Sequence, residues 1–200
     1  MAYDGIVSRH LNRRLSRPMA AALAPTPITP NMVTLFTLAL AFVTGGLIAV
    51  GANVAGGVLI QAVSVIDGVD GDLARRTGRA SRFGEILDAV TDRYADAAMI
   101  AGMTVFAVRF EGHGHAEFVG VLALAGSLTV SYSRARIEGA LRMAPSDGVF
   151  GLASRDVRSL VAAIGTVLGQ CYWTLAVLFV ASALTVAWRL AFLVVRRPAA

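Results

Sequence analysis

The chain has 200 residues, of which 56% are hydrophobic and 16% are charged, and its formal net charge is +5. Its mean hydropathy of +0.66 excludes an ordinary soluble domain and indicates a single membrane-embedded domain. We expect such a basic protein to contact anionic membrane lipid, and we expect no nucleic-acid partner. The one cysteine, Cys171, excludes a disulfide within the chain.

Residues 1–24 are expected to form a juxtamembrane amphipathic helix. The first residues lack the basic start and apolar core of a signal peptide. Arginines surround an apolar face, which predicts a helix that lies along the membrane surface. That face consists of Ile6, Leu11, Leu15, Met19 and Leu23. The first spanning helix then begins at Pro30, because Thr29 is a good N-cap residue and proline is favoured in the first turn.

Residues 25–200 contain six apolar segments that predict six transmembrane helices. A full crossing takes about 20 residues, so the fifth segment is short and needs the apolar turn that follows it. The sequence therefore predicts an all-α integral membrane protein, with six transmembrane helices preceded by an interfacial amphipathic helix. The six segments are 32–50, 53–74, 83–108, 118–139, 157–170 and 173–194.

Arginines alternate with neutral loops along the chain, and this pattern predicts the orientation. The loops at 51–53, 109–117 and 169–172 carry little positive charge. By the positive-inside rule, both termini lie in the cytoplasm and the protein is a multi-pass protein of the cell membrane. The arginines on the cytoplasmic side are Arg9, Arg13, Arg14, Arg17, Arg75, Arg76, Arg79, Arg82, Arg142, Arg155, Arg158, Arg196 and Arg197.

Four aspartates lie inside or beside these apolar segments, at the predicted cytoplasmic end. Asp67 and Asp70 are spaced i,i+3, and Asp88 and Asp92 are spaced i,i+4, so each pair shares one helical face. Ionised carboxylates near a bilayer require a counter-charge. Two antiparallel helices would bring the four carboxylates to one or two divalent cations, and oxygen ligands favour Mg²⁺, Mn²⁺ or Ca²⁺.

Small residues flank the aspartates. Gly71 and Ala74 follow Asp70, and Gly84 opens the next helix. A glycine at this place is often explained by close helix packing alone. Beside Arg75 and a metal site, however, small side chains also leave room for a nucleotide diphosphate, whose oxygens the metal and the guanidinium would neutralise.

The spacing Asp-x2-Asp-Gly-x2-Ala-Arg-x8-Gly-x3-Asp-x3-Asp resembles the motif of the CDP-alcohol phosphotransferases, and every position is filled. The resemblance implies a homodimeric integral membrane enzyme that uses Mg²⁺ or Mn²⁺. Such an enzyme transfers a substituted phosphate from a CDP-linked donor to an alcohol and releases CMP. The matching residues are Asp67, Asp70, Gly71, Ala74, Arg75, Gly84, Asp88 and Asp92.

Residue roles follow from this resemblance. Asp67, Asp70 and Asp88 are expected to bind metal, and Asp92 is expected to be a further ligand or the general base. The expected nucleotide-binding residues are Asp67, Asp70, Gly71, Ala74, Arg75 and Gly84. Asp72 and Asp96 lie outside the motif. We interpret Asp72 as a solvated or arginine-paired surface carboxylate, and Asp96 as a partner of Arg93 or a residue that supports a metal ligand.

The acceptor is predicted from arginines in the second half of the chain. Arg134, Arg136, Arg155 and Arg158 lie near the cytoplasmic ends of the fourth and fifth segments. They would form a pocket for a phosphorylated polyol acceptor, since arginine binds phosphate with charge-assisted hydrogen bonds. The alternative is a belt of arginines at the membrane edge, in which Arg134 simply pairs with Glu138 at i,i+4.

Residues 4–13, 87–96 and 155–158 resemble the di-myo-inositol-phosphate phosphate synthase branch of the family. The resemblance implies CDP-inositol as donor and inositol phosphate as acceptor, with a cytidylyltransferase as a fused or separate partner. The main alternative is a phospholipid synthase that joins CDP-diacylglycerol to inositol phosphate or glycerol phosphate. Alternatives of a different class are a cation transporter, since intramembrane aspartates also mark ion paths, and a structural scaffold, which would leave the buried aspartates unexplained.

Overall fold

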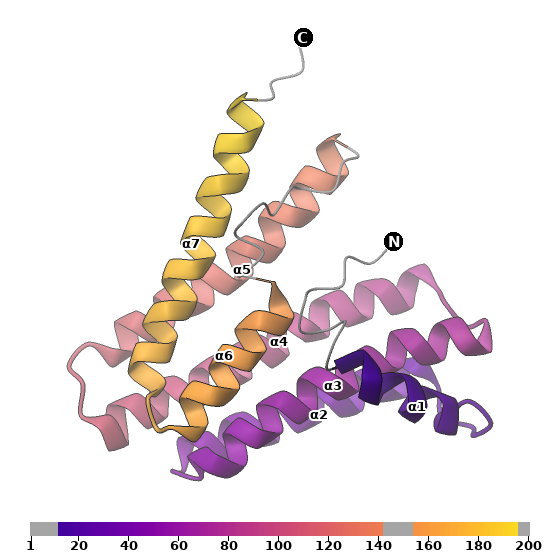
Figure 1. Cartoon of the computed structure of the whole chain (residues 1–200), viewed down its shortest axis with the longest axis horizontal. Helices are drawn as coiled ribbons and strands as arrows, with labels where there is room; N and C mark the ends of the chain where they lie inside the picture. The colour runs from indigo at the N-terminus through magenta and orange to yellow at the C-terminus, as the bar shows by residue number, and fades with distance from the viewer. Residues whose placement is uncertain (1–11, 142–153, 196–200) are drawn as a thin grey trace.

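The computed structural model describes residues 12–141 and 154–195, and these residues form an all-helical fold (Figure 1). Within these two ranges there is no β-strand, as the sequence predicts. The helices are α1 (Arg13–Leu23), α2 (Pro30–Ala49), α3 (Asn53–Thr77), α4 (Arg82–Phe106), the π-helical turn η2 (Ala107–Glu111), α5 (Ala116–Leu141), α6 (Arg155–Val167) and α7 (Cys171–Val195).

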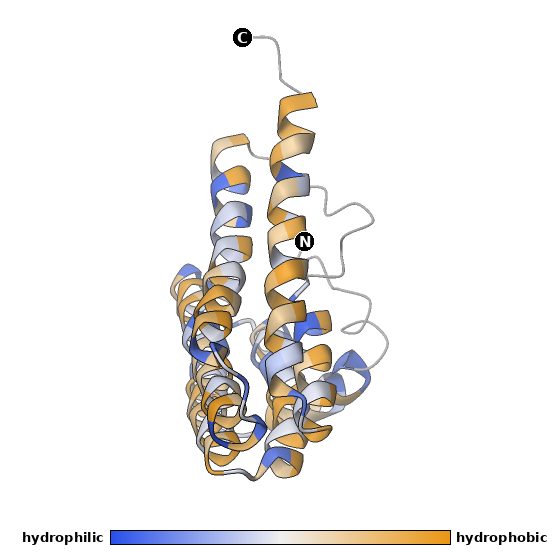
Figure 2. Cartoon of the chain, turned by 90° about the vertical axis from the view of Figure 1, so that its left-hand side faces the viewer, coloured by the Kyte–Doolittle hydropathy of each residue, from blue (hydrophilic) through white to orange (hydrophobic). Residues whose placement is uncertain are grey.

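Each of the six predicted segments contains a helix, but four of these helices are long and apolar enough to cross a membrane: α2, α3, α5 and α7. α7 is hydrophobic along most of its length (Figure 2). α6 has 13 residues and is roughly 20 Å long, shorter than the hydrocarbon core of about 30 Å. α4 has 25 residues, but its first half is rich in charged residues. The prediction of six crossings is therefore not confirmed.

Local signals fix the helix ends on both sides of the aspartate motif. The Met32 backbone N–H donates to the Thr29 hydroxyl oxygen at 3.3 Å, so Thr29 is the N-cap of α2, as predicted. α3 ends at Gly78, whose φ of +65° is left-handed and favours glycine. The Gly84 N–H donates to the Ser81 hydroxyl oxygen at 3.0 Å and caps α4. The short turn between α3 and α4 sets the motif halves opposite one another.

At the other end of the bundle, α2 and α4 pack through glycines. A Cβ atom placed on Gly45 would lie 2.3 Å from the carbonyl oxygen of Ala98, and one on Gly102 would lie 2.3 Å from the carbonyl oxygen of Gly45. The two backbones are therefore in direct contact, as is common where membrane helices pack closely. Buried apolar side chains, including Ile48 and Met103, surround this contact.

α1 packs against α3 and lies over the aspartate end of the bundle (Figure 1). Ser16 and Ala20 face inward and are buried, whereas Leu15 and Met19 are 50% and 39% exposed. The exposed apolar side chains are those expected of a helix at a membrane surface. Ile6 and Leu11 of the predicted apolar face lie outside the described residues, and the division into 1–24 and 25–200 stays a prediction.

α6 packs between α3 and α7, and α7 runs along α5 (Figure 1). At the start of α7, the Glu111 carboxylate accepts hydrogen bonds from the backbone N–H groups of Cys171 and Tyr172. This contact satisfies N–H groups that have no partner within the helix. At the opposite end of α6, its first residue, Arg155, reaches the aspartates of α3 and α4.

Candidate active site

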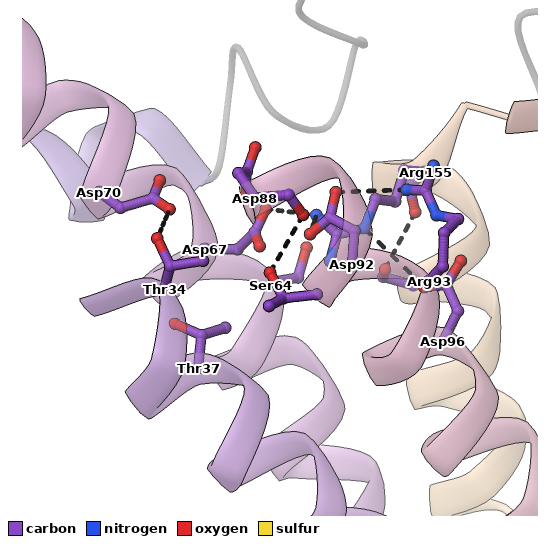
Figure 3. Close-up of polar contacts among 12 residues, drawn as sticks. Thr34, Thr37, Ser64, Asp67, Asp70, Asp88, Asp92, Arg93, Asp96 and Arg155 are labelled. Carbon is purple, nitrogen blue, oxygen red and sulfur yellow. Dashed lines mark hydrogen bonds and ion pairs between the residues drawn. The ribbon is translucent and has the colours of Figure 1, made fainter. Parts of the chain in front are cut away.

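Three aspartates from two helices meet at the site (Figure 3). Asp67 of α3 and Asp88 and Asp92 of α4 each offer a carboxylate oxygen, and these oxygens lie within 4.8 Å of one another. The side chains are half-buried, so their charges are only partly screened by solvent. The chemistry and spacing of the oxygen donors fit a Mg²⁺ or Mn²⁺ ion. Three of the four predicted metal ligands are thus brought together.

The fourth predicted ligand, Asp70, is directed toward α2 (Figure 3). Thr34 donates a hydrogen bond from its hydroxyl to Asp70 at 2.6 Å, and the backbone N–H of Gly71 donates to the other carboxylate oxygen. Asp70 is buried. It lies on the wall of the same cavity as the three clustered aspartates, but its carboxylate is held by α2.

Arginines balance the charge of the cluster. The Arg155 guanidinium pairs with Asp67 and, through the same nitrogen, with Asp92 at 2.8 Å. Arg93 pairs with the second oxygen of Asp92 at 3.3 Å. Arg155 was predicted from the sequence as an acceptor-binding residue. In the structure it contacts two carboxylates of the cluster and also lines the cavity.

Asp96 lies one helical turn after Asp92 and belongs to a second polar group. It accepts a hydrogen bond from the Ser127 hydroxyl at 2.8 Å and pairs with Arg158 at 3.2 Å. The pairing with Arg93 that the sequence suggested is replaced, because Arg93 contacts Asp92 and the partners of Asp96 come from α5 and α6.

Asp72 is not a surface carboxylate. It is 7% exposed and accepts a hydrogen bond from the Ser16 hydroxyl of α1 at 2.9 Å. The predicted arginine pairing is confirmed, with Arg75 at 2.7 Å and Arg13 at 3.8 Å. Asp72 therefore joins α1 to α3 and turns the motif residue Arg75 toward itself.

A cavity of about 450 Å³ opens beside the cluster, and the residues on its wall test the sequence predictions. Gly71 and Arg75 line one side, and Arg134, Arg155 and Arg158 line the other. Ala74, Gly84 and Arg136 do not line it. A Cβ atom on Gly84 would lie 3.2 Å from the Ser81 hydroxyl oxygen and 3.4 Å from the Asn31 side-chain oxygen, so Gly84 lies close to the start of α2.

Arg134 and Arg136 separate for a simple geometric reason. Residues two apart on a helix point to nearly opposite faces, and Arg136 is exposed on the outer face of α5. Arg134 lines the cavity and also pairs with Glu138 at 2.9 Å, as the alternative interpretation expected. Arg155 and Arg158, three residues apart, share one face.

Sequence reasoning missed Arg189 of α7. This side chain is 4% exposed, lines the cavity and donates to the Val130 carbonyl at 2.6 Å and the Ser133 hydroxyl at 2.9 Å. The signal was present, since a single arginine inside an apolar span indicates function by default. Asn12, on the α1 side of the cavity, was missed as well, and it donates to the Ser64 hydroxyl at 3.0 Å.

Comparison with known proteins identifies the family of this chain. The sequence profile of the CDP-alcohol phosphatidyltransferases matches residues 27–195. The chain belongs to the CDP-alcohol phosphatidyltransferase family. The matched range includes the whole motif and all helices from α2 to α7.

The chain is similar in sequence to two kinds of relative. The chain is 46% identical over 166 residues to the bifunctional IPC transferase and DIPP synthase of Rubrobacter xylanophilus, a match that covers 83% of this chain and 37% of the relative. It is 33% identical over 196 residues to the phosphatidylinositol phosphate synthase of Mycobacteroides abscessus, covering 94% and 87%. The chain therefore spans little more than a third of the bifunctional relative.

Solved structures share the fold. The phosphatidylinositol phosphate synthase of Mycobacterium tuberculosis with CDP-DAG bound superposes with a TM-score of 0.77 at 26% identity, covering 89% of this chain and 92% of that one. The same enzyme with manganese and citrate gives a TM-score of 0.76 at 25% identity, covering 88% and 87%. The helical arrangement of this chain is that of its family.

Proposed function

We propose that the chain is a metal-dependent transferase that moves a substituted phosphate from a CDP-linked alcohol to the hydroxyl of a phosphorylated polyol. The observation that carries the proposal is the cluster of Asp67, Asp88 and Asp92, whose oxygens lie within 4.8 Å of one another on the wall of an arginine-lined cavity. Such a site can neutralise a diphosphate on one side and attract an anionic acceptor on the other.

The donor is proposed to bind on the α3 side of the cavity. Asp67 and Asp88 would hold one or two Mg²⁺ or Mn²⁺ ions, with Asp70 beside them and Asp92 as a further ligand or as the general base. Bound divalent ions would neutralise charge on the diphosphate oxygens of the donor. Gly71 leaves space next to Arg75, since a Cβ atom there would lie 3.4 Å from its guanidinium. Arg75 would add a positive charge near the nucleotide.

In the proposed reaction, the acceptor hydroxyl oxygen forms a bond to the β-phosphorus of the donor. The bond between that phosphorus and the bridging oxygen breaks, and CMP leaves with the bridging oxygen. Asp92, as general base, accepts the hydroxyl proton. Its position supports this role, because one oxygen lies 2.8 Å from Arg155 at the acceptor side of the cavity.

The acceptor is proposed to bind among the arginines of α5, α6 and α7. Arg155 and Arg158 of α6 and Arg189 of α7 line the cavity together with Arg134 of α5. Their guanidinium groups are suited to charge-assisted hydrogen bonds with phosphate oxygens, each worth roughly 1.5–3 kcal/mol. A neutral polyol would gain little from them, which is why we propose a phosphorylated acceptor.

For the donor we propose CDP-inositol, which with inositol phosphate would give di-myo-inositol-phosphate phosphate. Support comes from the 46% identity to a DIPP synthase. CDP-diacylglycerol is the second candidate. It is supported by the structural similarity to a phosphatidylinositol phosphate synthase with CDP-DAG bound, which covers 89% of this chain and 92% of that one. A cation transporter is less well supported, since the acidic cluster stands at one end of the bundle beside arginines.

We further propose that the protein acts as a homodimer in the cell membrane, with the site and both termini on the cytoplasmic side. The arginine-rich loops support this orientation. A cytidylyltransferase, fused or separate, would supply the CDP-linked donor.

The experiment that tests the proposal measures CMP release by the purified full chain in detergent or lipid. CDP-inositol and CDP-diacylglycerol are each offered with inositol phosphate, glycerol phosphate and free inositol. We expect CMP release with inositol phosphate and one donor, and at most weak release with free inositol. The Asp92→Asn variant is the control for contaminating activity. No CMP release in any combination with Mg²⁺ or Mn²⁺ present would contradict the proposed function.

A further inference from the structure

Asp96 is a buried carboxylate that the family motif does not include. It lies on α4, is 8% exposed, and forms part of the wall of a small cavity of about 30 Å³ that is lined mainly by apolar side chains. A charge in such surroundings is unfavourable unless it is paired and hydrogen-bonded. The partners of Asp96 therefore decide why it can be there.

Those partners come from two other helices. Ser127 of α5 donates to one carboxylate oxygen at 2.8 Å, and Arg158 of α6 pairs with the same oxygen at 3.2 Å. The Nε atom of Arg155, also of α6, lies 3.8 Å from the second oxygen. One carboxylate thus contacts both arginines on the inner face of α6.

Arg158 depends on this contact. It is 8% exposed, and its second guanidinium nitrogen, Nη1, has no hydrogen-bond partner among the described residues. The small cavity is large enough for one water molecule beside it. A guanidinium in this position needs a counter-charge, and Asp96 is the carboxylate in contact with it.

Arg155 lies between Asp96 and the aspartate cluster. Its Nε atom faces Asp96, while its Nη1 atom contacts Asp67 and Asp92. The Nε atom has no hydrogen-bond partner among the described residues, so Asp96 attracts the planar guanidinium by its charge at 3.8 Å. Figure 3 shows Asp96 and Asp92 on either side of Arg155.

We propose that Asp96, held by Ser127, is a positioning residue that orients Arg155 and Arg158 for the phosphate group of the acceptor. Asp96 would set the affinity for the acceptor without touching either substrate. The inference rests on the proposed function, because it assigns these arginines to a phosphorylated acceptor.

The test compares Asp96→Asn with wild type in the CMP-release assay. We expect the acceptor KM to rise about tenfold or more, because the arginines lose their orientation, and the donor KM to change less than about twofold. Asp96→Glu restores the charge and should recover part of the acceptor affinity. Glu117→Gln, the same chemical change on the exposed start of α5, is the matched control and should leave both values unchanged.

A binding measurement keeps the inference independent of turnover. Inorganic phosphate and inositol phosphate should each raise the thermal unfolding midpoint of the wild type, and the concentration needed should rise about tenfold in Asp96→Asn. If the wild type releases no CMP, the proposed function fails, whereas the phosphate measurement still decides whether Asp96 organises an anion site.

A milder variant covers the case in which Asp96→Asn does not fold. Ser127→Ala removes one hydrogen bond to Asp96 and should raise the acceptor KM in the same direction by a smaller factor, about twofold to fivefold. The inference is overturned if these variants lower stability but leave the acceptor KM and phosphate affinity unchanged. It is also overturned if they weaken donor and acceptor equally.

Discussion

At one end of the bundle the backbones of α2 and α4 touch, and at the other end α3 and α4 hold charged side chains beside a cavity of about 450 Å³. The close end is made by glycines such as Gly45 and Gly102, which leave no side chain between the helices. The open end is held by polar contacts between helices. The same few helices thus provide both a close-packed end and an open site lined by polar residues.

The aspartates at the open end fall into two groups by their contacts. Asp70, Asp72 and Asp96 each accept a hydrogen bond from a hydroxyl on a different neighbouring helix. Asp67, Asp88 and Asp92 instead converge on one another. The aspartates of this region thus divide into those that accept a hydrogen bond from a hydroxyl of a neighbouring helix and those whose clustered oxygens could hold a cation. Changes at the two ends should therefore affect different properties.

Removal of divalent cations should have the largest effect. The carboxylates of Asp67, Asp88 and Asp92 repel one another, and a substrate diphosphate would add further negative charge. We expect excess EDTA to abolish CMP release and Mg²⁺ or Mn²⁺ to restore it, while α-helical content measured by circular dichroism is unchanged. Full turnover in excess EDTA would contradict a metal-dependent site.

The Asp92→Asn variant tests whether Asp92 acts as the general base or as a metal ligand. If Asp92 accepts the hydroxyl proton, kcat should fall by at least about a hundredfold while donor binding survives. Asp67→Asn should weaken metal-dependent binding of the donor as well. Donor titration of both variants checks this difference. An equal loss of donor binding in both would mean that Asp92 acts chiefly as a metal ligand.

Arg155→Ala should have an intermediate effect that is largest on the acceptor. We expect the acceptor KM to rise about tenfold, because a charge-assisted contact to phosphate is lost. Arg136→Ala is the comparison, since Arg136 is exposed on α5 and does not line the cavity. Steady-state kinetics should show less than about a twofold change there. Equal effects in both variants would support the belt of arginines at the membrane edge.

Gly45→Ala should lower the stability of the protein at the close end, where α2 and α4 touch. Among these changes it should have the smallest effect on the rate of CMP release. The added methyl group would lie 2.3 Å from the Ala98 carbonyl oxygen, and overpacking of this kind typically destabilises by about 1–3 kcal/mol. We expect the thermal unfolding midpoint in detergent to fall by several degrees. Gly46→Ala is a matched control at the next position, where no heavy atom lies within 4 Å of the added carbon. A similar fall in both variants would exclude the close helix contact as the cause.

Much of the site was predictable because the motif has fixed helical spacing. The i,i+4 spacing of Asp88 and Asp92 sets both on one face, and the turn at Gly78 brings them opposite Asp67. Asp70 was harder to place, since its direction depends on the Thr34 hydroxyl of another helix. The number of crossings stays unconfirmed, because four of the helices are long and apolar enough to cross a membrane, whereas α6 has 13 residues and α4 is rich in charged residues in its first half.

The sequence by itself determined the helical class, the cap at Thr29, the aspartate motif and the family resemblance. These follow from local composition and short-range spacing, which act within a few turns of one helix. Tertiary structure decided which carboxylates converge, that Arg155 reaches them, that Arg189 joins the cavity and that Asp96 pairs with Arg158. Those contacts depend on how helices far apart in the chain rotate and pack against one another, and local sequence patterns do not encode that rotation.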